Sequence, residues 1–457
     1  MFKKSFYIFT GYIGGNSTTI KTKNYRETIT KNITYELEDD KFTSRTKNGS
    51  TRAFLRRRVL TIKNLIVIIM SASRAMQREL DDFFRKLNSA DFTIGEVTKS
   101  AFTQARSKLN AWAFIRLNEI AANTFYNESE YYVWHNMRTL AVDGTRLVLP
   151  NSDDIKKEFS QHSFGPNADS PRSMALGSML YDVLNQITID SQLAPYTGSE
   201  QDLLKEHLNH VKAGDLLLLD RGYPSIALLY LLIAKKIEFC VRMKENWWLK
   251  VKDFSNSTEK ECIVKFSLPK KDWAKLKDYP ELLDKEICCR LIKVELENGE
   301  KEILCTSLID DKKYSYDDFE GLYHLRWNEE EAYKLLKTRI EIENFSGKTA
   351  LSVRQDFHAK IFLLTLCAAY AHPITERVSQ EYKADQDRKY EQQINQTNAI
   401  ASTREILIQV FLKGNIQKAL DAFDHIVAAT REIVRPNRKN ERKHRPKKLY
   451  SMNNKRL

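Results

Sequence analysis

The run Asp215-Leu-Leu-Leu-Leu-Asp220-Arg-Gly constrains the fold more than any other part of the sequence. Four consecutive leucines form a continuous apolar segment, which is typical of a strand buried on both faces of a sheet. A second apolar segment, Thr139-Leu-Ala-Val, runs into Asp143 and Gly144. We therefore expect an α/β core in which Asp143 and Asp220 lie at the carboxyl ends of strands, where the sites of open α/β sheets gather.

The patterns on either side of these strands divide the chain of 457 residues into segments with different periodicity. Apolar residues at helical spacing give way to alternating strands and helices, then to period-two strand patterns, and finally to helices again. The expected segments are an extension without firm structure (1–50), a helical domain (51–130), the first part of the α/β core (131–244), a β-rich insertion (245–318), the final helices of the core (319–371), a linker with a helical C-terminal region (372–434) and a basic tail (435–457).

Positive charge is concentrated at the two ends of the chain. Residues 1–130 and 435–457 each carry a net charge of +9, whereas residues 131–434 carry −5. Basic ends suit a polyanionic partner such as nucleic acid, although a role in solubility explains the charge equally well. The helix expected from Lys99 has a polar face, and its residue types contact base edges and phosphates in DNA-binding proteins. That face consists of Thr103, Gln104, Arg106 and Lys108. An ordinary solvated helix has a similar pattern.

Membrane and zinc-binding proteins fit the sequence poorly. No uninterrupted apolar run reaches the roughly 18 to 20 residues that a membrane span needs. The six cysteines include no C-x-x-C pair and lie mostly in apolar contexts, so we expect buried thiols in a reducing compartment. We expect no membrane partner and no zinc.

The helix expected from Phe319 to Thr338 carries an unusual polar stripe. Tyr323, Arg326, Glu330 and Lys337 follow at steps of three, four and seven, which places them on one side of a helix. A solvated face with an Arg326–Glu330 ion pair is the ordinary explanation. However, Glu330 and the two strand-end aspartates could form a carboxylate cluster, whose members repel one another unless cations are present. Mg²⁺ prefers such oxygens, and two ions can stabilise the attacking and leaving oxygens of phosphoryl transfer.

Three blocks of the sequence resemble DDE transposases of the insertion-sequence-4 family. They are Leu140-Ala-Val-Asp143-Gly-Thr, Leu216-Leu-Leu-Leu-Asp220-Arg-Gly-Tyr and Tyr323-x2-Arg326-x3-Glu330-x6-Lys337. The third spacing is met in full. The similarity extends from about Phe54 to Ala371 and includes the β-rich insertion between the second aspartate and the glutamate.

The resemblance implies a ribonuclease-H-like catalytic core in which Asp143, Asp220 and Glu330 bind two Mg²⁺ ions, which Mn²⁺ can replace. It implies no other cofactor. Water would free a 3′-hydroxyl at the transposon end. That hydroxyl would attack the opposite strand to form a hairpin during excision, and the end would later be joined to target DNA.

The same resemblance assigns Tyr323, Arg326 and Lys337 to the phosphates of the DNA ends. It assigns the N-terminal helices to the terminal inverted repeats. Members act as homodimers on paired double-stranded DNA ends, which places the protein in the cytoplasm at the nucleoid.

Several alternatives remain open at this level. A catalytically silent DNA-binding protein derived from a transposase would keep the basic ends. A glycosidase using two of the carboxylates would leave Arg326 and Lys337 unexplained. Within the third block, helical spacing selects Glu330, because Glu329 and Glu331 point about 100° to either side. His207 and His210 are expected on a surface helix, not at a metal.

Overall fold

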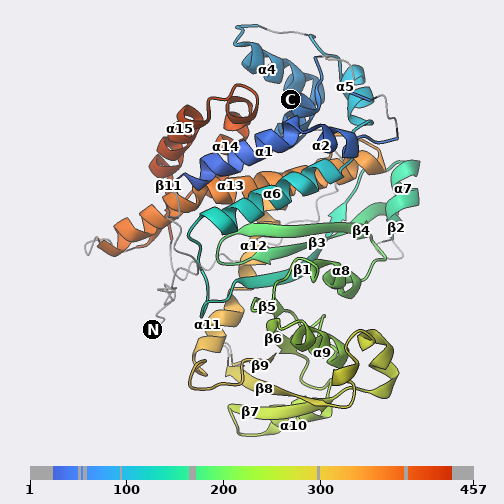
Figure 1. Cartoon of the computed structure of the whole chain (residues 1–457), viewed down its shortest axis with the longest axis vertical. Helices are drawn as coiled ribbons and strands as arrows, with labels where there is room; N and C mark the ends of the chain where they lie inside the picture. Colours follow the sequence, from blue (N-terminus) through green and yellow to red (C-terminus); the bar gives the residue numbers. More distant parts are fainter. Residues whose placement is uncertain are drawn as a thin grey trace.

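The structure is a computed structural model that describes residues 24–49, 53–54, 59–92, 95–163, 171–295, 299–384 and 390–434. It has a mixed α/β fold in which helices from both ends of the chain gather at one end of the long axis (Figure 1). The nine strands β1 to β9, which come from the middle of the chain, lie in the remainder. The predicted basic tail and the first 23 residues lie outside the described part of the chain.

A single sheet of nine strands organises the middle of the chain. Neighbouring strands run in the order β2-β3-β1-β5-β6-β9-β8-β7, and β4 pairs with β3. Strands β1, β5 and β6 are parallel to one another, whereas β1, β3 and β4 form an antiparallel meander. The strands are β1 (Thr139–Val148), β2 (Gln161–His162), β3 (Arg172–Asp182), β4 (Ile187–Pro195), β5 (Leu216–Leu219), β6 (Glu238–Met243), β7 (Glu261–Ser267), β8 (Glu286–Glu295) and β9 (Lys301–Thr306).

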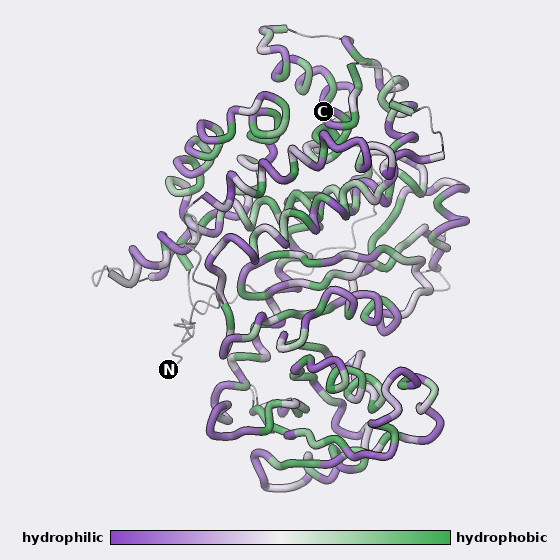
Figure 2. The backbone as a smooth tube through the Cα atoms, in the orientation of Figure 1, coloured by the Kyte–Doolittle hydropathy of each residue, from purple (hydrophilic) through white to green (hydrophobic). Residues whose placement is uncertain are grey.

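The four leucines of β5 are buried on both faces of this sheet, as their sequence predicts. Leu216 and Leu218 belong to the larger apolar core, whereas Leu217 and Leu219 belong to a second core on the opposite face. This division follows from the period of two along a strand. Figure 2 shows hydrophobic residues concentrated in the central strands and helices, in agreement with a sheet covered on two sides.

Helices cover the two faces of the sheet. On one face, α6 (Trp112–Glu128) and α13 (Ala350–Ala384) pack against β4, and α12 (Trp327–Thr338) packs against β1. The opposite core includes apolar residues of the helices α8 (Glu200–His207), α9 (Ile226–Ala234) and α10 (Leu249–Asn256). The remaining helix between β1 and β2 is α7 (Asp153–Phe159).

The segment 245–318 extends the sheet. Its strands β8 and β9 pair antiparallel with each other, β9 also pairs with β6, and β7 forms the edge beside β8. The segment also contains α10 and two short 3₁₀ helices, Lys270–Leu276 and Pro280–Leu282. The insertion therefore continues the main sheet instead of forming a separate one.

The N-terminal region contains two helices that the sequence did not predict. The helices are α1 (Tyr25–Glu38) and α2 (Asp40–Arg45), so the expectation of no firm structure in 1–50 is wrong for this stretch. Ile29, Ile33 and Leu37 are buried at steps of four along α1, which packs against α6. Polar Thr, Asn and Lys residues lie between these apolar positions, so the apolar stripe is hard to recognise in the sequence. The stability of the helix therefore depends on tertiary packing.

Helix α13 is longer than predicted and runs through Pro373. The sequence predicted a linker from 372, so this prediction is wrong for 372–384. The stretch Ala350–Tyr382 is long and apolar enough to cross a membrane, but 89% of its most apolar window is buried within the protein. We therefore interpret α13 as the central helix of the larger core.

The other helices surround α13. Those of the region 51–130 are α3 (Ile62–Ser71), α4 (Met76–Asn88) and α5 (Lys99–Arg106), followed by α6. After α13 come the short strands β10 (Gln392–Ile394) and β11 (Arg431–Ile433), which flank α14 (Gln396–Phe411) and α15 (Ile416–Ala429). Helix α14 contacts α3, α13 and α15, so the two ends of the chain share one helical region.

Candidate active site

Asp143 and Asp220 come side by side because of strand register. The parallel pairing of β1 with β5 ends at Val142 opposite Leu219, and each aspartate is the next residue. The prediction that Asp143 ends its strand is wrong. Strand β1 continues to Val148, and over this stretch it is paired with β3. The site therefore lies where the parallel neighbour stops, not where both strands stop.

The third acidic residue comes from a helix that is interrupted. The stretch Phe319–Thr338, predicted as one helix, consists of α11 (Asp318–His324) and α12 with a junction at Leu325 and Arg326. Near this junction Arg326 is buried, and its guanidinium donates a 2.9 Å hydrogen bond to Glu330. The same guanidinium lies 3.7 Å from a carboxylate oxygen of Asp143.

Tyr323 completes the contacts among the predicted site residues. Its hydroxyl lies 3.4 Å from a carboxylate oxygen of Asp220 and 3.5 Å from the carbonyl oxygen of Leu219. Tyr323 and Arg326 together thus touch all three acidic residues, Asp143, Asp220 and Glu330. The structure brings these five side chains, which come from three segments of the chain, into one cluster.

The electrostatics of this cluster favour a cation. Burial raises the pKa of Asp143 to about 6, and the carboxylates of Glu200 and Glu330 also raise it, while Arg326 acts in the opposite direction. A carboxyl group with this pKa takes up a proton near neutrality unless positive charge is supplied. One buried arginine therefore does not fully compensate the acidic side chains around it.

Glu329 also belongs to the site, in a role that the sequence did not indicate. Its side chain is 0% exposed, and one carboxyl oxygen accepts a 3.0 Å hydrogen bond from the backbone N–H of Asp143. The other oxygen has no hydrogen-bond partner. Burial raises the pKa of Glu329 well above its usual range, so we expect a neutral group that supports β1. Tyr333 also supports Asp143, by donating a 2.8 Å hydrogen bond to its carbonyl oxygen.

A further carboxylate, Glu200, approaches the cluster from the first turn of α8. A Cβ atom at Gly144 would lie 2.6 Å from a carboxylate oxygen of Glu200, and one at Gly222 would lie 4.0 Å from the other oxygen. Glu200 therefore lies over the residues that follow Asp143 and precede Tyr223. Nothing in its local sequence distinguishes it, because its proximity depends on the crossover from β4 to β5.

Beneath Asp143 is a buried polar relay that consists of Ser178, His207 and Asp190. The Ser178 hydroxyl lies 3.1 Å from the carbonyl oxygen of Asp143 and 3.0 Å from Nε2 of His207. Nδ1 of His207 lies 2.7 Å from a carboxylate oxygen of Asp190. Burial acts to raise the pKa of Asp190, but the interactions with His207, Gln192 and His210 together outweigh burial and lower the pKa to about 2. The prediction of a surface position is therefore wrong for His207, which is fully buried.

The predicted DNA contacts are distributed differently. Lys337 donates a 2.9 Å hydrogen bond to the carbonyl oxygen of Arg146, and Thr103 and Gln104 are exposed on α5. Arg106 is only 4% exposed and forms a buried ion pair with Asp356 on α13. This burial contradicts the prediction that Arg106 contacts DNA. Arg106 follows Phe102 by four residues and shares the buried face of α5 with it.

The donor set suits a hard divalent cation, because carboxylate oxygens are the ligands that Mg²⁺ prefers. Within the described ranges, no group of three or more His, Cys, Asp or Glu side chains is arranged to hold a metal ion. Instead, Arg326 contacts both Glu330 and Asp143. The carboxylates therefore fit a divalent cation by the chemistry of their oxygens, while two of them, Asp143 and Glu330, lie next to Arg326.

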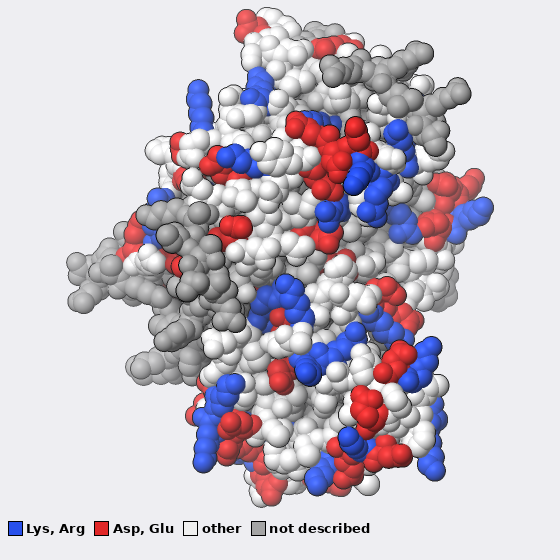
Figure 3. Space-filling view, viewed as in Figure 1, with Lys and Arg blue, Asp and Glu red and all other residues white. Residues whose placement is uncertain are grey.

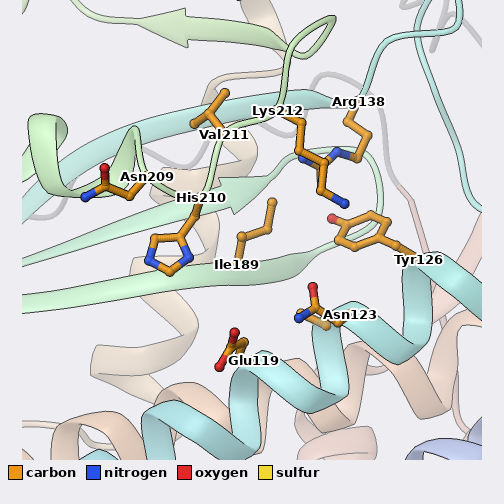
Figure 4. Close-up of a pocket in the computed structure, with 10 residues that line it drawn as sticks. Glu119, Asn123, Tyr126, Arg138, Ile189, Asn209, His210, Val211 and Lys212 are labelled. Carbon is orange, nitrogen blue, oxygen red and sulfur yellow. The ribbon is translucent and has the colours of Figure 1, made fainter. Parts of the chain in front are cut away.

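A separate cavity of about 190 Å³ lies away from these acidic residues (Figure 4). It is bounded by α6, the start of β1 and the loop after α8. Arg138, one of its lining residues, is paired with Asp215, and its guanidinium also lies over the ring of Tyr126. Because this basic group already has a partner, we assign the cavity no role in the chemistry.

The sequence of this chain resembles those of known proteins. Residues 134–366 match a family model described as Transposase DDE domain. A curated relative, "Transposase InsG for insertion sequence element IS4" of Escherichia coli (strain K12), is 22% identical over 315 residues, which cover 66% of this chain and 67% of that protein. A solved piggyBac transposase synaptic complex with hairpin DNA gives a TM-score of 0.44 with 11% identity, covering 89% of this chain and 83% of that one.

Proposed function

Because the chain belongs to the family of proteins with a transposase DDE domain, we propose that it excises and reinserts a DNA element by two-metal-ion chemistry. DDE transposases are metal-dependent enzymes that cleave and transfer DNA strands. The observation that carries the proposal is the meeting of Asp143, Asp220 and Glu330 around Tyr323 and Arg326. Three of the four residues of the spaced motif, Tyr323, Arg326 and Glu330, take part in this cluster.

We further propose that the core is ribonuclease-H-like. The strand order β4-β3-β1-β5-β6, with an antiparallel meander followed by two strands parallel to β1, supports this assignment. Under this proposal, the segments 131–244 and 319–371 make up the core, and 245–318 is inserted between them. The edge strands β9, β8 and β7 then belong to the insertion.

In this proposal Asp143, Asp220 and Glu330 hold two divalent cations, Mg²⁺ or Mn²⁺, at the end of β5. Bound cations of this kind stabilise the attacking and leaving oxygens of an in-line phosphoryl displacement. Tyr323, Arg326 and Lys337 would contact phosphates next to the scissile one. Arg326 pairs with Glu330 in this DNA-free structure, so cation binding to the carboxylates would free its guanidinium for a phosphate.

The DNA partner would be double-stranded, with the terminal inverted repeats bound by the helical region 51–130 and the target bound at the site. The exposed Thr103 and Gln104 on α5 support a role for that helix in DNA binding. We also propose a homodimer in the active complex, acting on two paired ends at the nucleoid. On the face shown in Figure 3, basic and acidic side chains are interspersed. The described part of this face therefore does not form one large basic surface that would attract DNA.

The test is cleavage of a labelled duplex that carries the inverted repeat found beside the coding sequence. We expect nicking that requires Mg²⁺ or Mn²⁺ and stops when the metal is removed by a chelator. Asp220→Asn should reduce nicking to background while DNA binding persists, because the substitution removes a carboxylate charge with little change in volume. Asp202→Asn, at an exposed position of α8, should leave nicking unchanged.

Binding without cleavage by the unmodified protein, over a range of metals and pH, would contradict the proposal. That result would favour the catalytically silent DNA-binding protein. Equal nicking by Asp220→Asn and the unmodified protein would contradict the assignment of the site.

A further inference from the structure

Glu200 is the one carboxylate at the site that lies outside the three motif blocks. Its two carboxylate oxygens face Gly144 and Gly222, the residues next to Asp143 and two after Asp220. Glycine leaves the space that the carboxylate occupies, because a Cβ at Gly144 would also lie 2.9 Å from Cδ and Cγ of Glu200. Glu200 therefore spans the two chain segments that carry the aspartates.

Glu200 makes no hydrogen bond or ion pair with any described residue. The Arg326 guanidinium, the cation nearest to the cluster, is already paired with Glu330 and lies near Asp143. The Glu200 carboxylate lies against Gly144, the residue that follows Asp143. A partly buried carboxylate beside another carboxylate, with no cation of its own, is costly unless a positive ion is supplied.

An independent observation comes from Tyr223, which is only 2% exposed. Its buried hydroxyl has no hydrogen-bond partner. Tyr223 follows Gly222, where an added Cβ would lie 4.0 Å from a carboxylate oxygen of Glu200. Buried hydroxyls are normally hydrogen-bonded, so an orphaned one at this position points to a polar partner that binds beside it. A hydrated cation is such a partner.

We propose that Glu200 is a fourth carboxylate of the cation site and binds a divalent ion together with Asp143 and Asp220. This inference rests on the proposed function, because it adds a ligand to the same site. It differs in placing a ligand on α8, between β4 and β5, outside the motif blocks. Gly144 then has a specific purpose, because only a residue without a Cβ leaves room for the Glu200 carboxylate beside Asp143.

The test is direct binding of Mn²⁺ to the full-length protein without DNA, followed by the paramagnetic resonance signal of free Mn²⁺. We expect Glu200→Gln to weaken Mn²⁺ binding by about tenfold or more, the scale on which groups around a metal act. Asp220→Asn should weaken it at least as much. The matched control is Glu206→Gln, an exposed acidic residue at the other end of α8, which should leave the affinity unchanged.

A second variant tests the same idea through geometry. In Gly144→Ala the new Cβ would lie 2.6 Å from the Glu200 carboxylate and force it away. We expect Gly144→Ala to weaken Mn²⁺ binding when Glu200 is present and to have little further effect in the Glu200→Gln background. Circular dichroism of each variant would establish that it is folded.

The outcomes separate the two proposals. If Asp220→Asn loses Mn²⁺ while Glu200→Gln behaves like Glu206→Gln, the role of Glu200 is overturned and the proposed function stands. If Asp220→Asn binds Mn²⁺ as tightly as the unmodified protein, the cation site of the proposed function is itself overturned, and the role of Glu200 with it.

Discussion

His207 has both ring nitrogens within hydrogen-bond distance of buried oxygens. The Ser178 hydroxyl, which donates to the carbonyl oxygen of Asp143, lies 3.0 Å from Nε2 of His207. Nδ1 of His207 lies 2.7 Å from a carboxylate oxygen of Asp190. The relay therefore connects the buried Asp190 to the backbone of β1 at Asp143.

We expect His207→Leu to lower the free energy of unfolding by about 3 kcal/mol, because it leaves the buried Asp190 carboxylate and the buried Ser178 hydroxyl without the partner that they share. Urea denaturation measures the change. His210→Leu is the control, since His210 is exposed and its Nε2 lies 3.8 Å from Asp190, and it should cost less than about 0.5 kcal/mol. Equal effects of the two substitutions would show that the relay does not stabilise the fold.

At the level of elements, α1 explains how α13 continues through a proline. Pro373 has no N–H, so the carbonyl oxygen of Ala369 loses its partner within the helix. The Tyr25 hydroxyl of α1 donates a 2.9 Å hydrogen bond to that oxygen, and Arg26 donates a 3.2 Å bond to the carbonyl oxygen of Tyr370. Helix α1 thus supplies the Ala369 carbonyl oxygen with a donor in place of the one that the proline removes, and Arg26 adds a contact one residue further along α13.

Tyr25→Phe should therefore destabilise the protein by about 1 to 3 kcal/mol, because a buried carbonyl oxygen is left without a donor while the ring remains. Thermal or urea unfolding would show the shift. Tyr35→Phe makes the same chemical change on the same helix at a position that is 66% exposed, and should change stability by less than about 0.5 kcal/mol. A Tyr25→Phe protein as stable as Tyr35→Phe would mean that another group satisfies Ala369.

At the scale of the whole chain, the acidic cluster and the excess of positive charge lie in different segments of the sequence. Residues 131–434, which contain the acidic cluster, carry a net charge of −5, whereas the tail 435–457 carries +9. A negatively charged core repels DNA at long range. The basic ends therefore have to supply most of the electrostatic attraction to a duplex.

We predict that deleting 435–457 weakens DNA binding and flattens its dependence on salt. Each phosphate contact that is lost should reduce the slope of log affinity against log salt concentration by about 0.9. Fluorescence anisotropy with a labelled duplex between about 50 and 200 mM salt measures that slope. A full-length protein with the tail lysines and arginines changed to glutamine should match the deletion. An unchanged slope in both would assign the tail to solubility.

The sequence alone determined those features that depend on short-range patterns. Four leucines between Asp215 and Asp220 specify a doubly buried strand wherever the chain places it, because side chains alternate along any strand. The spacing from Tyr323 to Glu330 brings its members to one side even though the helix is interrupted at Leu325 and Arg326, because these residues keep right-handed helical backbone angles.

Tertiary structure alone decided which side chains meet from distant segments. Glu200, Glu329 and His207 have ordinary local surroundings, and only the crossover from β4 to β5 and the packing of α12 on β1 bring them to Asp143. The same reason explains the wrong prediction for Arg106. It was expected to contact DNA, but it is buried against Asp356, which is 250 residues away in the sequence. Local periodicity depends on the backbone geometry of a few residues. Burial and pairing depend on which surfaces pack against each other in the completed fold, and no short segment of sequence specifies this.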